Sequence, residues 1–293
     1  SICIPHLNTP FFLDAAIEHI NLYKHPEIEH EIIVVDQSTP YLLDGKSPEY
    51  KGNTLLHRPK IDAGYPIDVA VKFAKGEYFV TLDCDAFPIH KNWLWLPIEL
   101  MKRRGFLMVG NSTQLAKAYH MKGPFFHLNN YFRVMKTETA RKLSEDVGFM
   151  RYASRRLVNY APKDTSWEKT PVVDCDNGVI AMWYSDQQKM GEKFSLKISR
   201  NLGLTNKVGL YGMIIDDLVY HQVFAWPEVG DTRIALGQDY LDLRERMMKG
   251  ITPEMIRELV SKTVEHPEAR LLNSDDNPAP KELDDLVEEL KRA

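Results

Sequence analysis

The sequence predicts an α/β fold in which helices wrap a central, mainly parallel sheet. The first 85 residues alternate strands with helices, the order typical of βα units in a parallel sheet. The strand expected at 31–36 contains four consecutive apolar residues, as in strands buried on both faces. Carboxylates follow two of the expected strands, and ligand sites in such sheets lie beyond the carboxyl ends of the strands.

Apolar periodicity and helix-ending residues place the elements of the first half. The expected strands cover 1–4, 31–36, 54–57 and 77–82, and the expected helices cover 10–23 and 64–75. Pro5 is expected to end the first strand, and Pro10 suits the first turn of the first helix. Gly76 is expected to close the second helix in the usual C-terminal position. The last strand of this half leads directly into Asp83-Cys84-Asp85.

The second half is less regular, and its end is rich in charge and proline. Helices are expected at 90–104, 137–147 and 177–190, and extended segments at 106–109, 125–135, 208–215 and 217–224. We expect one domain over 1–235 and a helical C-terminal extension over 236–293. Within the extension, 273–281 resembles a linker and 282–293 an amphipathic helix.

Composition and charge limit the class of protein. The chain has 293 residues, with 37 Lys and Arg against 41 Asp and Glu, so the formal net charge is −4. This balance gives no electrostatic reason to expect nucleic acid or an anionic membrane as the main partner. Cys3, Cys84 and Cys175 form no CxxC pair, which argues against a disulfide scaffold or a structural zinc site and favours a reducing compartment.

Targeting segments are not evident in the sequence. No apolar run has the length of a membrane span, and the start lacks the pattern of a secretory signal. The sequence opens on Ser1 without an initiator Met, so we expect a few residues to precede it. We expect a cytoplasmic protein, and its C-terminal helices leave room for a peripheral position at a membrane.

Asp83-Cys84-Asp85 is the central motif. Two carboxylates two residues apart, just past a buried strand, can reach one hard divalent cation directly or through water. Such a cation would stabilise a departing diphosphate. A solvated turn is the alternative interpretation, because Asp-x-Asp is common by chance. Its position after two βα units favours a binding site.

The order of motifs resembles the donor-binding half of family 2 glycosyltransferases. The similarity covers about the first hundred residues and is more specific than any one motif. It is carried by Ser1-Ile2-Cys3-Ile4-Pro5, by Glu31-Ile32-Ile33-Val34-Val35-Asp36, by Gly64 with Ala70, and by Ala74-Lys75-Gly76-Glu77-Tyr78-Phe79-Val80-Thr81-Leu82-Asp83-Cys84-Asp85-Ala86.

The resemblance implies a GT-A fold, a nucleotide-diphospho-sugar donor and Mn²⁺ or Mg²⁺. By this similarity Asp36 holds the nucleobase or ribose, Asp83 the ribose or metal, and Asp85 the metal. Residues 1–105 would then form the nucleotide-sugar-binding half and 106–235 the acceptor-binding half. Arg58 stands where it could reach the nucleotide, although a solvent-exposed arginine fits equally well.

Two departures from the family pattern leave the nucleobase open, with a UDP-sugar favoured. Gln37 follows Asp36 where relatives often carry a second acidic residue. Asp68 replaces the usual Asn of the helix that precedes the Asp-x-Asp motif. Both changes concern the nucleobase more than the fold.

A second carboxylate motif, Asp174-Cys175-Asp176-Asn177-Gly178, precedes an expected helix. An inverting transfer needs a base to deprotonate the acceptor hydroxyl, and we assign Asp176 to this role in preference to Asp174. Asp176-Asn177-Gly178 also resembles the Asp-Thr-Gly at the acceptor side of some relatives. The alternative is a helix N-cap, which an Asp at this position would satisfy.

His221 is the third candidate. Imidazole can bind Mn²⁺, and the resemblance implies a late histidine that completes the metal shell. A packed structural histidine is the alternative. Several aromatic residues could stack against a sugar, but most aromatic side chains belong to cores, and none is assigned individually: Trp93, Trp95, Tyr131, Phe132, Trp183 and Trp226.

Three rival functions share parts of this pattern. A haloacid-dehalogenase-type phosphatase would carry its Asp-x-Asp on an early strand, and a nucleotidylyltransferase would need a Gly-rich basic loop after the first strand. A sugar-nucleotide-binding protein without transferase activity is the non-enzyme alternative. The sequence favours a metal-dependent, inverting glycosyltransferase. Its acceptor could be a glycan, lipid, protein or small molecule, with nucleic acid less favoured, and its oligomeric state is open.

Overall fold

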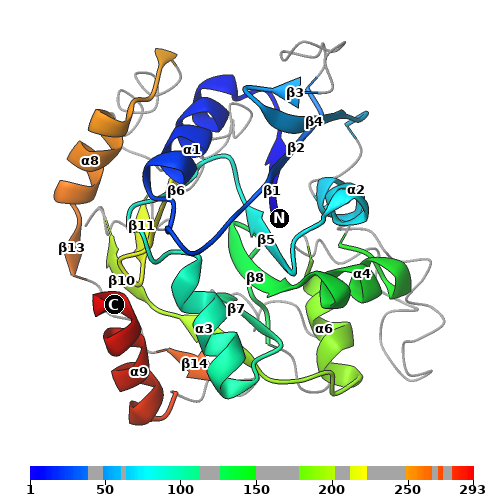
Figure 1. Cartoon of the computed structure of the whole chain (residues 1–293), viewed down its shortest axis with the longest axis vertical. Coiled ribbons are helices and arrows are strands. Elements are labelled where there is room, and N and C mark those ends of the chain that lie inside the picture. The colour runs from blue at the N-terminus through cyan, green and yellow to red at the C-terminus, as the bar shows by residue number, and fades with distance from the viewer. Residues whose placement is uncertain are drawn as a thin grey trace, which may run out of the picture.

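The computed structural model describes most of the chain, in nine segments. These segments are residues 1–38, 49–60, 64–112, 126–149, 178–201, 212–222, 249–265, 270–272 and 279–293. They form two sheets with helices packed around them (Figure 1). Among the described helices, none is both long and apolar enough to span a membrane.

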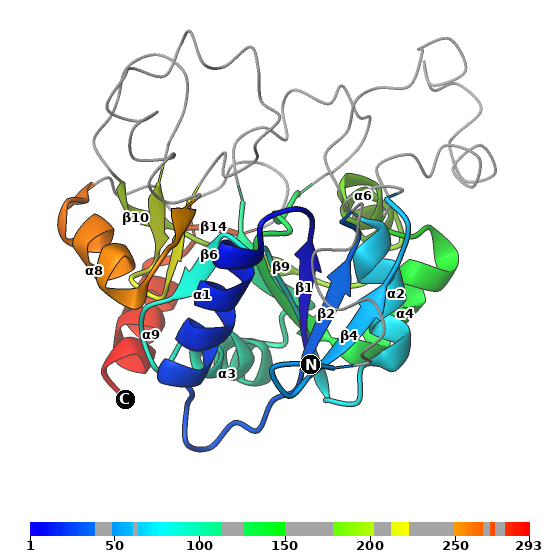
Figure 2. The ribbon, with the colours of Figure 1, turned by 90° about the horizontal axis from the view of Figure 1, so that it is seen from above.

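The larger sheet contains nine strands of the described residues. They are β1 (Ile2–His6), β2 (Ile32–Asp36), β3 (Glu49–Tyr50), β4 (Asn53–His57), β5 (Tyr78–Leu82), β7 (Met108–Asn111), β8 (Phe132–Lys136), β9 (Lys193–Leu196) and β14 (Leu271–Leu272). Their spatial order is β14-β9-β7-β8-β5-β1-β2-β4-β3. The strands β5, β1, β2 and β4 are parallel, so their carboxyl ends lie on the same side of the sheet (Figure 2).

Helices cover both faces of this sheet because its strands are apolar on both sides. The helices are α1 (Pro10–Leu22), α2 (Tyr65–Phe73), α3 (Trp95–Arg104), α4 (Thr137–Asp146), α6 (Val179–Gln187), α8 (Pro253–Ser261) and α9 (Lys281–Arg292). Ile2 and Ile4 pack with α1, α3 and α9. Cys3, between them, faces the opposite core with α2, α4 and α6. This alternation places the two groups of helices on opposite sides (Figure 1).

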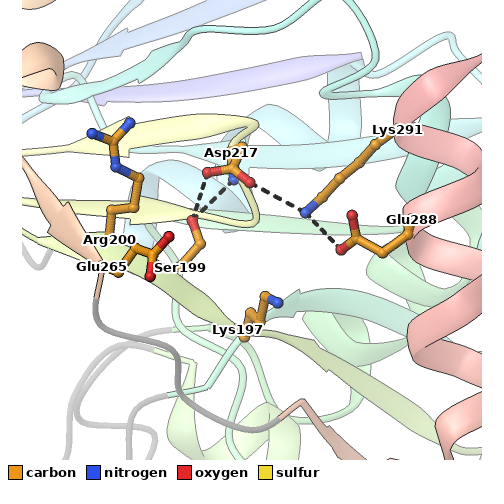
Figure 3. Close-up of a pocket in the computed structure, with 7 residues that line it drawn as sticks. All are labelled: Lys197, Ser199, Arg200, Asp217, Glu265, Glu288 and Lys291. Carbon is orange, nitrogen blue, oxygen red and sulfur yellow. Dashed lines mark hydrogen bonds and ion pairs between the residues drawn. The ribbon is translucent and has the colours of Figure 1, made fainter.

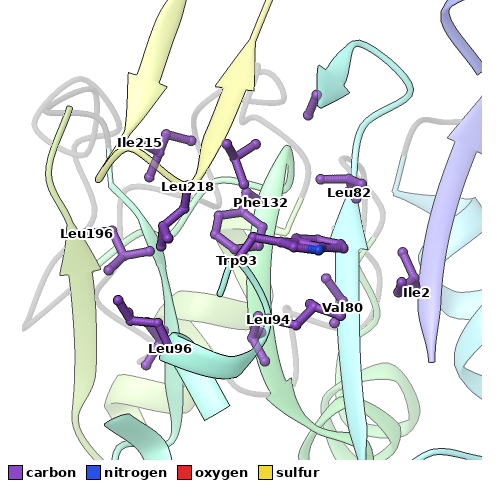
Figure 4. Close-up of a cluster of buried hydrophobic side chains, with 14 of the residues drawn as sticks. Ile2, Val80, Leu82, Trp93, Leu94, Leu96, Phe132, Leu196, Ile215 and Leu218 are labelled. Carbon is purple, nitrogen blue, oxygen red and sulfur yellow. The ribbon is translucent and has the colours of Figure 1, made fainter. Parts of the chain in front are cut away.

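A smaller antiparallel sheet stands beside the first. It is formed by β6 (Ala86–Pro88), β10 (Ile198–Asn201), β11 (Met213–Ile215), β12 (Val219–His221) and β13 (Val264–Glu265), in the order β13-β10-β11-β12-β6. Side chains from both sheets meet in one apolar core, where Trp93 packs against Phe132 and Leu218 lies near Leu196 (Figure 4). This core holds β6 and β12 next to the carboxyl end of β5.

Some details of the expected elements are wrong: the helix expected at 90–104 begins only at Trp95, and the segment expected at 125–135 becomes a strand only at Phe132. Pro5 does not end β1, which pairs with β2 as far as His6. A proline is tolerated there because β5 pairs only with Ile2 and Cys3, so Pro5 has a paired neighbour on one side only. Gly76 does not close α2, which ends at Phe73 with the extended Ala74 as its cap. Gly76 instead passes close to Ser1, where an added Cβ would lie 2.7 Å from the Ser1 nitrogen.

The C-terminal helices expected from the sequence are present as α8 and α9, and the short strands β13 and β14 are additional. Arg270 ties this part of the chain to the smaller sheet. Its guanidinium, 2% exposed, lies 2.7 Å from the fully buried Asp216 carboxylate and also pairs with Asp284 and Glu288 of α9. Burial acts to lower the pKa of Arg270, but Asp216 and the α9 carboxylates outweigh it and raise that pKa.

Arg270→Ala should lower the free energy of unfolding by about 3 kcal/mol, the low end for breaking a buried ion pair, because Lys291 still pairs with Asp216 at 3.1 Å. Urea unfolding followed by circular dichroism measures the change. Arg257→Ala is the matched control, since Arg257 is half-exposed and pairs with the exposed Glu254, and it should change stability little. Equal losses in the two variants would contradict the anchoring role of Arg270.

Candidate metal centre and nucleotide site

Asp83 and Asp85 lie in the turn that links the two sheets. β5 ends at Leu82 and β6 begins at Ala86, so the whole Asp83-Cys84-Asp85 motif occupies the connection. The Ala86 N–H donates to the Asp83 carbonyl at 3.0 Å, which closes the turn. The Asp83 N–H donates to the Tyr131 carbonyl at 3.2 Å. The backbone of the motif is therefore held at both of its ends.

His221 reaches this turn through the pairing of β12 with β6. The two strands are antiparallel, and His221 stands opposite Ala86. The next residue, Gln222, donates its N–H to the Asp85 carbonyl at 2.9 Å. As a result His221 Nε2 lies 3.4 Å from Asp85 Oδ1. Residues that are far apart in the sequence are thus neighbours.

The three side chains form a cluster that fits a divalent cation. Asp83, Asp85 and His221 each offer a ligand atom, and these atoms all lie within 4.8 Å of one another. Asp85 and His221 are buried, whereas Asp83 is partly open. Two carboxylates and an imidazole are a donor set that Mn²⁺ accepts. Asp83, Asp85 and His221 therefore fit the Mn²⁺ or Mg²⁺ expected from the sequence.

Cys84 separates the two aspartates but does not share their chemistry. Its thiol lies 3.3 Å from the Thr9 hydroxyl. Burial raises the pKa of the Cys84 thiol, and the Asp85 carboxylate raises it further. The thiol therefore stays protonated at neutral pH, which argues against nucleophilic cysteine chemistry here.

Asp36 lies at the carboxyl end of β2 and is completely buried. Its Oδ1 accepts hydrogen bonds from His6 Nδ1 at 2.9 Å and from the Ser38 N–H at 3.0 Å. Its Oδ2 lies 3.4 Å from His57 Nδ1. Oδ1 is therefore hydrogen-bonded within this chain, whereas the buried Oδ2 has no hydrogen-bond partner among the described residues.

The hydrogen bonds around Asp36 also define its charge state and the tautomer of His6. Burial acts to raise the pKa of Asp36, but the hydrogen bonds from His6 and Ser38 outweigh it and lower that pKa. The Thr9 N–H donates to His6 Nε2 at 3.2 Å. Because Nε2 accepts a hydrogen bond, the proton is on Nδ1, which donates to Asp36. Sequence reasoning assigned no role to His6 or His57, since only the fold brings both to Asp36.

Arg58 and Asp68 occupy different environments. Arg58 follows β4, donates its backbone N–H to the Asp36 carbonyl at 2.9 Å, and directs its guanidinium to the His57 carbonyl at 2.7 Å. Asp68 points away from this edge toward the end of α4. Its carboxylate accepts a hydrogen bond from the Ser144 hydroxyl at 2.6 Å and one from the Phe149 N–H at 3.0 Å. Asp68 therefore joins α2 to the loop after α4.

The second carboxylate motif lies outside the described residues, which resume at Gly178. Asp174 and Asp176, the candidate bases, are therefore not placed. Gly178 adopts a left-handed φ of 75° and begins α6. An added Cβ there would lie 2.8 Å from Asn130 Oδ1, so the chain entering α6 runs close to the loop before β8.

A charged pocket of about 370 Å³ lies at the other end of the β11–β12 hairpin from His221. It is lined by Lys197, Ser199, Arg200, Asp217, Glu265, Glu288 and Lys291 (Figure 3). Lys291 bridges Asp217 at 3.3 Å and Glu288 at 3.1 Å. These pairs fasten α9 to the hairpin, and the pocket contains none of the residues of the Asp83–Asp85–His221 cluster.

Comparison with known families identifies the class of protein. Residues 1–159 match the family model described as Glycosyl transferase family 2. Because the match covers more than half of the 293 residues, the chain belongs to glycosyl transferase family 2. Its sheet, parallel at the centre and covered by helices on both faces, is the GT-A architecture expected from the sequence.

The chain is also similar to solved structures of glycosyltransferases. TarS 1-349 from S. aureus is 17% identical over 54% of this chain and 55% of that chain, with a TM-score of 0.37. The mannosyltransferase PcManGT from Pyrobaculum calidifontis, in complex with GDP-Man and Mn²⁺, is 17% identical over 50% and 46%, with a TM-score of 0.35. Glucosyl-3-phosphoglycerate synthase from Mycobacterium tuberculosis, in complex with Mn²⁺ and UDP-glucose, is 15% identical over 47% and 56%, with a TM-score of 0.32.

The chain spans about half the length of these three structures. No curated protein matches it significantly.

Asp36→Asn should lower the free energy of unfolding by about 2 kcal/mol near neutral pH, because it weakens two charge-assisted hydrogen bonds. The folded-state pKa of Asp36 lies below its ordinary value of 3.8. The stability that the carboxylate contributes is therefore present above that value and is lost as pH falls below it. Urea unfolding at a series of pH values should show the difference from wild type shrinking below about pH 4.

Asp285→Asn is the matched control for this pH series, because Asp285 is an exposed carboxylate on α9. Its stability should follow the wild-type curve. A difference between wild type and Asp36→Asn that stays constant down to the acid limit would contradict the lowered pKa.

Proposed function

We propose that this protein is a metal-dependent glycosyltransferase that moves a sugar, with inversion, from a nucleotide-diphosphate donor to an acceptor. UDP-sugars are the favoured donors. One observation carries the proposal: Asp83, Asp85 and His221 bring their ligand atoms within 4.8 Å of one another. They do so beyond the carboxyl ends of the parallel strands, where α/β sheets bind ligands. Membership of glycosyl transferase family 2 supports the same activity.

Asp85 and His221 would hold Mn²⁺ or Mg²⁺, and Asp83 would contact both the metal and the donor ribose. When bound, the cation supplies positive charge that stabilises the departing diphosphate. The protein's part is to hold three ligands in place before the donor arrives. The 3.4 Å separation of His221 Nε2 and Asp85 Oδ1 supports this role, because two such groups can bind one ion without large movement.

The nucleoside would bind at the adjacent edge, where β2 and β4 end. Asp36 and Arg58 are the residues that the sequence assigns to it. Because the Asp36 side chain is fully buried and its Oδ1 is hydrogen-bonded to His6 and Ser38, we assign it an indirect role. It would orient the two histidines, and His57, which is 14% exposed at its side chain, would stand nearer the nucleoside. Arg58 would lie at the same rim.

Asp176 is the proposed base that deprotonates the acceptor hydroxyl as the anomeric carbon is attacked. The acceptor half of the domain would comprise 106–235, opposite the donor half of 1–105, and 236–293 would form the C-terminal extension. The acceptor class stays open among glycans, lipids, proteins and small molecules. We expect the protein to work in the cytoplasm, where nucleotide sugars are available, or at a membrane surface facing it.

Asp85→Ala should abolish metal-dependent nucleotide binding, because it removes a carboxylate ligand from the cluster. Calorimetric titration of UDP and of GDP, with Mn²⁺ and then with chelator, measures this effect. Wild type should bind one of the two nucleotides more tightly with Mn²⁺ than with chelator. Asp285→Ala, which removes an exposed carboxylate of α9, should bind like wild type. If neither nucleotide binds wild type under any metal condition, the donor site is wrong.

Donor turnover distinguishes the transferase from a sugar-nucleotide-binding protein without activity. Wild type with Mn²⁺ should slowly hydrolyse the accepted UDP-sugar in the absence of acceptor, and Asp176→Asn should bind the donor normally while losing transfer. Release of UDP from a panel of UDP-sugars measures the first effect. Tight, metal-dependent binding without hydrolysis or transfer to any acceptor would favour the non-enzyme alternative.

A further inference from the structure

Tyr131 contacts two of the three candidate metal ligands. Its ring is stacked on the imidazole of His221, with centroids 4.1 Å apart and an angle of 16° between the planes. Its carbonyl accepts the Asp83 N–H at 3.2 Å. Tyr131 lies just before β8 and is itself buried. Tyr131 therefore contacts His221 through its ring and Asp83 through its backbone.

Besides the Nε2 contact with Asp85, the imidazole of His221 is held by the stack on Tyr131. A histidine that binds a metal usually donates its second ring N–H to a carboxylate or carbonyl, which fixes the ring. His221 Nδ1 is buried and has no hydrogen-bond partner among the described residues. The β6–β12 ladder places the His221 backbone, but backbone pairing does not by itself set the side-chain torsions. The face of Tyr131 restricts them.

Tyr131 is in turn held by a polar network. Its hydroxyl donates to Asn111 Oδ1 and accepts a hydrogen bond from Asn129 Nδ2 at 2.9 Å. Asn111 Nδ2 donates to the Leu196 carbonyl at 2.9 Å. These hydrogen bonds connect β9, through Asn111 of β7, to the Tyr131 ring that stacks on His221. The ring is thus fixed to β7 and β9 of the large sheet.

We propose that Tyr131 is a positioning residue of the metal centre, which orients His221 by stacking. The inference rests on the proposed metal site. It predicts that the aromatic ring, more than the hydroxyl, decides whether His221 can reach the metal. Removing the ring lets the imidazole turn away from Asp85 and weakens metal binding.

The test measures Mn²⁺ binding to the full chain, without donor or acceptor, by electron spin resonance. The signal of unbound Mn²⁺, followed as the protein is titrated, gives the dissociation constant. Nitrogen modulation of the spin echo reports coordination of the bound ion by His221. Tyr131→Leu should weaken Mn²⁺ binding by about 10-fold or more, the effect of losing an outer-shell partner, and should lose the nitrogen modulation. Tyr131→Phe, which keeps the ring, should retain both the modulation and an affinity near wild type.

Phe132→Leu is the matched control for a lost core aromatic. Phe132 is the next residue, is fully buried and packs against Trp93. This variant should lose stability much as Tyr131→Leu does, and thermal unfolding without metal checks that both are folded. It should keep the wild-type Mn²⁺ affinity and nitrogen signal, because it changes packing without touching the stack on His221.

The outcomes separate this inference from the metal site itself. Nitrogen modulation that persists in Tyr131→Leu, or is lost equally in Phe132→Leu, overturns the role of Tyr131 and leaves the metal site standing. Absence of nitrogen modulation in wild type, or of Mn²⁺ binding, overturns the site and the inference together. His221→Ala should lack the modulation, and its persistence there would assign the signal to another residue.

Discussion

The pairing of β6 with β12 is the constraint on which the candidate site depends. It puts His221 opposite Ala86 and so beside Asp85. The register is specified from the other face of the hairpin, where Tyr220 stacks near Phe87 in the core covered by α1 and α8. A slip of one residue would exchange the two faces and would put His221 into that apolar core. Apolar packing on one face of the β6–β12 pair therefore fixes the position of His221 on the other face.

Asp36 and the pair Asp83 and Asp85 differ in the groups that surround their carboxylates. Asp36 is surrounded by donors from its own chain, so its charge is stabilised in the folded protein without a ligand. Asp83 and Asp85 face each other and His221 across a few ångströms. Like charges held this close repel in a partly desolvated site, and a cation between them would relieve that repulsion. This contrast supports a scaffold role for Asp36 and a binding role for the other pair.

Much of the fold and part of the site could be predicted from local patterns. The parallel core follows from the apolar run Ile32 to Val35 and its alternation with helices, and Asp83 and Asp85 follow from their place after a strand. Pro5 and Gly76 misled the prediction, because their effects depend on neighbours. Pro5 is tolerated where β5 no longer pairs with β1, and Gly76 is placed by its close approach to Ser1. Neither neighbour is adjacent in the sequence.

The sequence by itself determined the strand–helix alternation of the first 85 residues, the family, and the carboxylates at the strand ends, because these depend on residues close together in the chain. Only the tertiary structure decided which side chains meet. It placed His6 and His57 around Asp36, directed Asp68 to the end of α4, and stacked Tyr131 on His221. Such contacts come from strand pairing and core packing between distant segments, and no local periodicity encodes them.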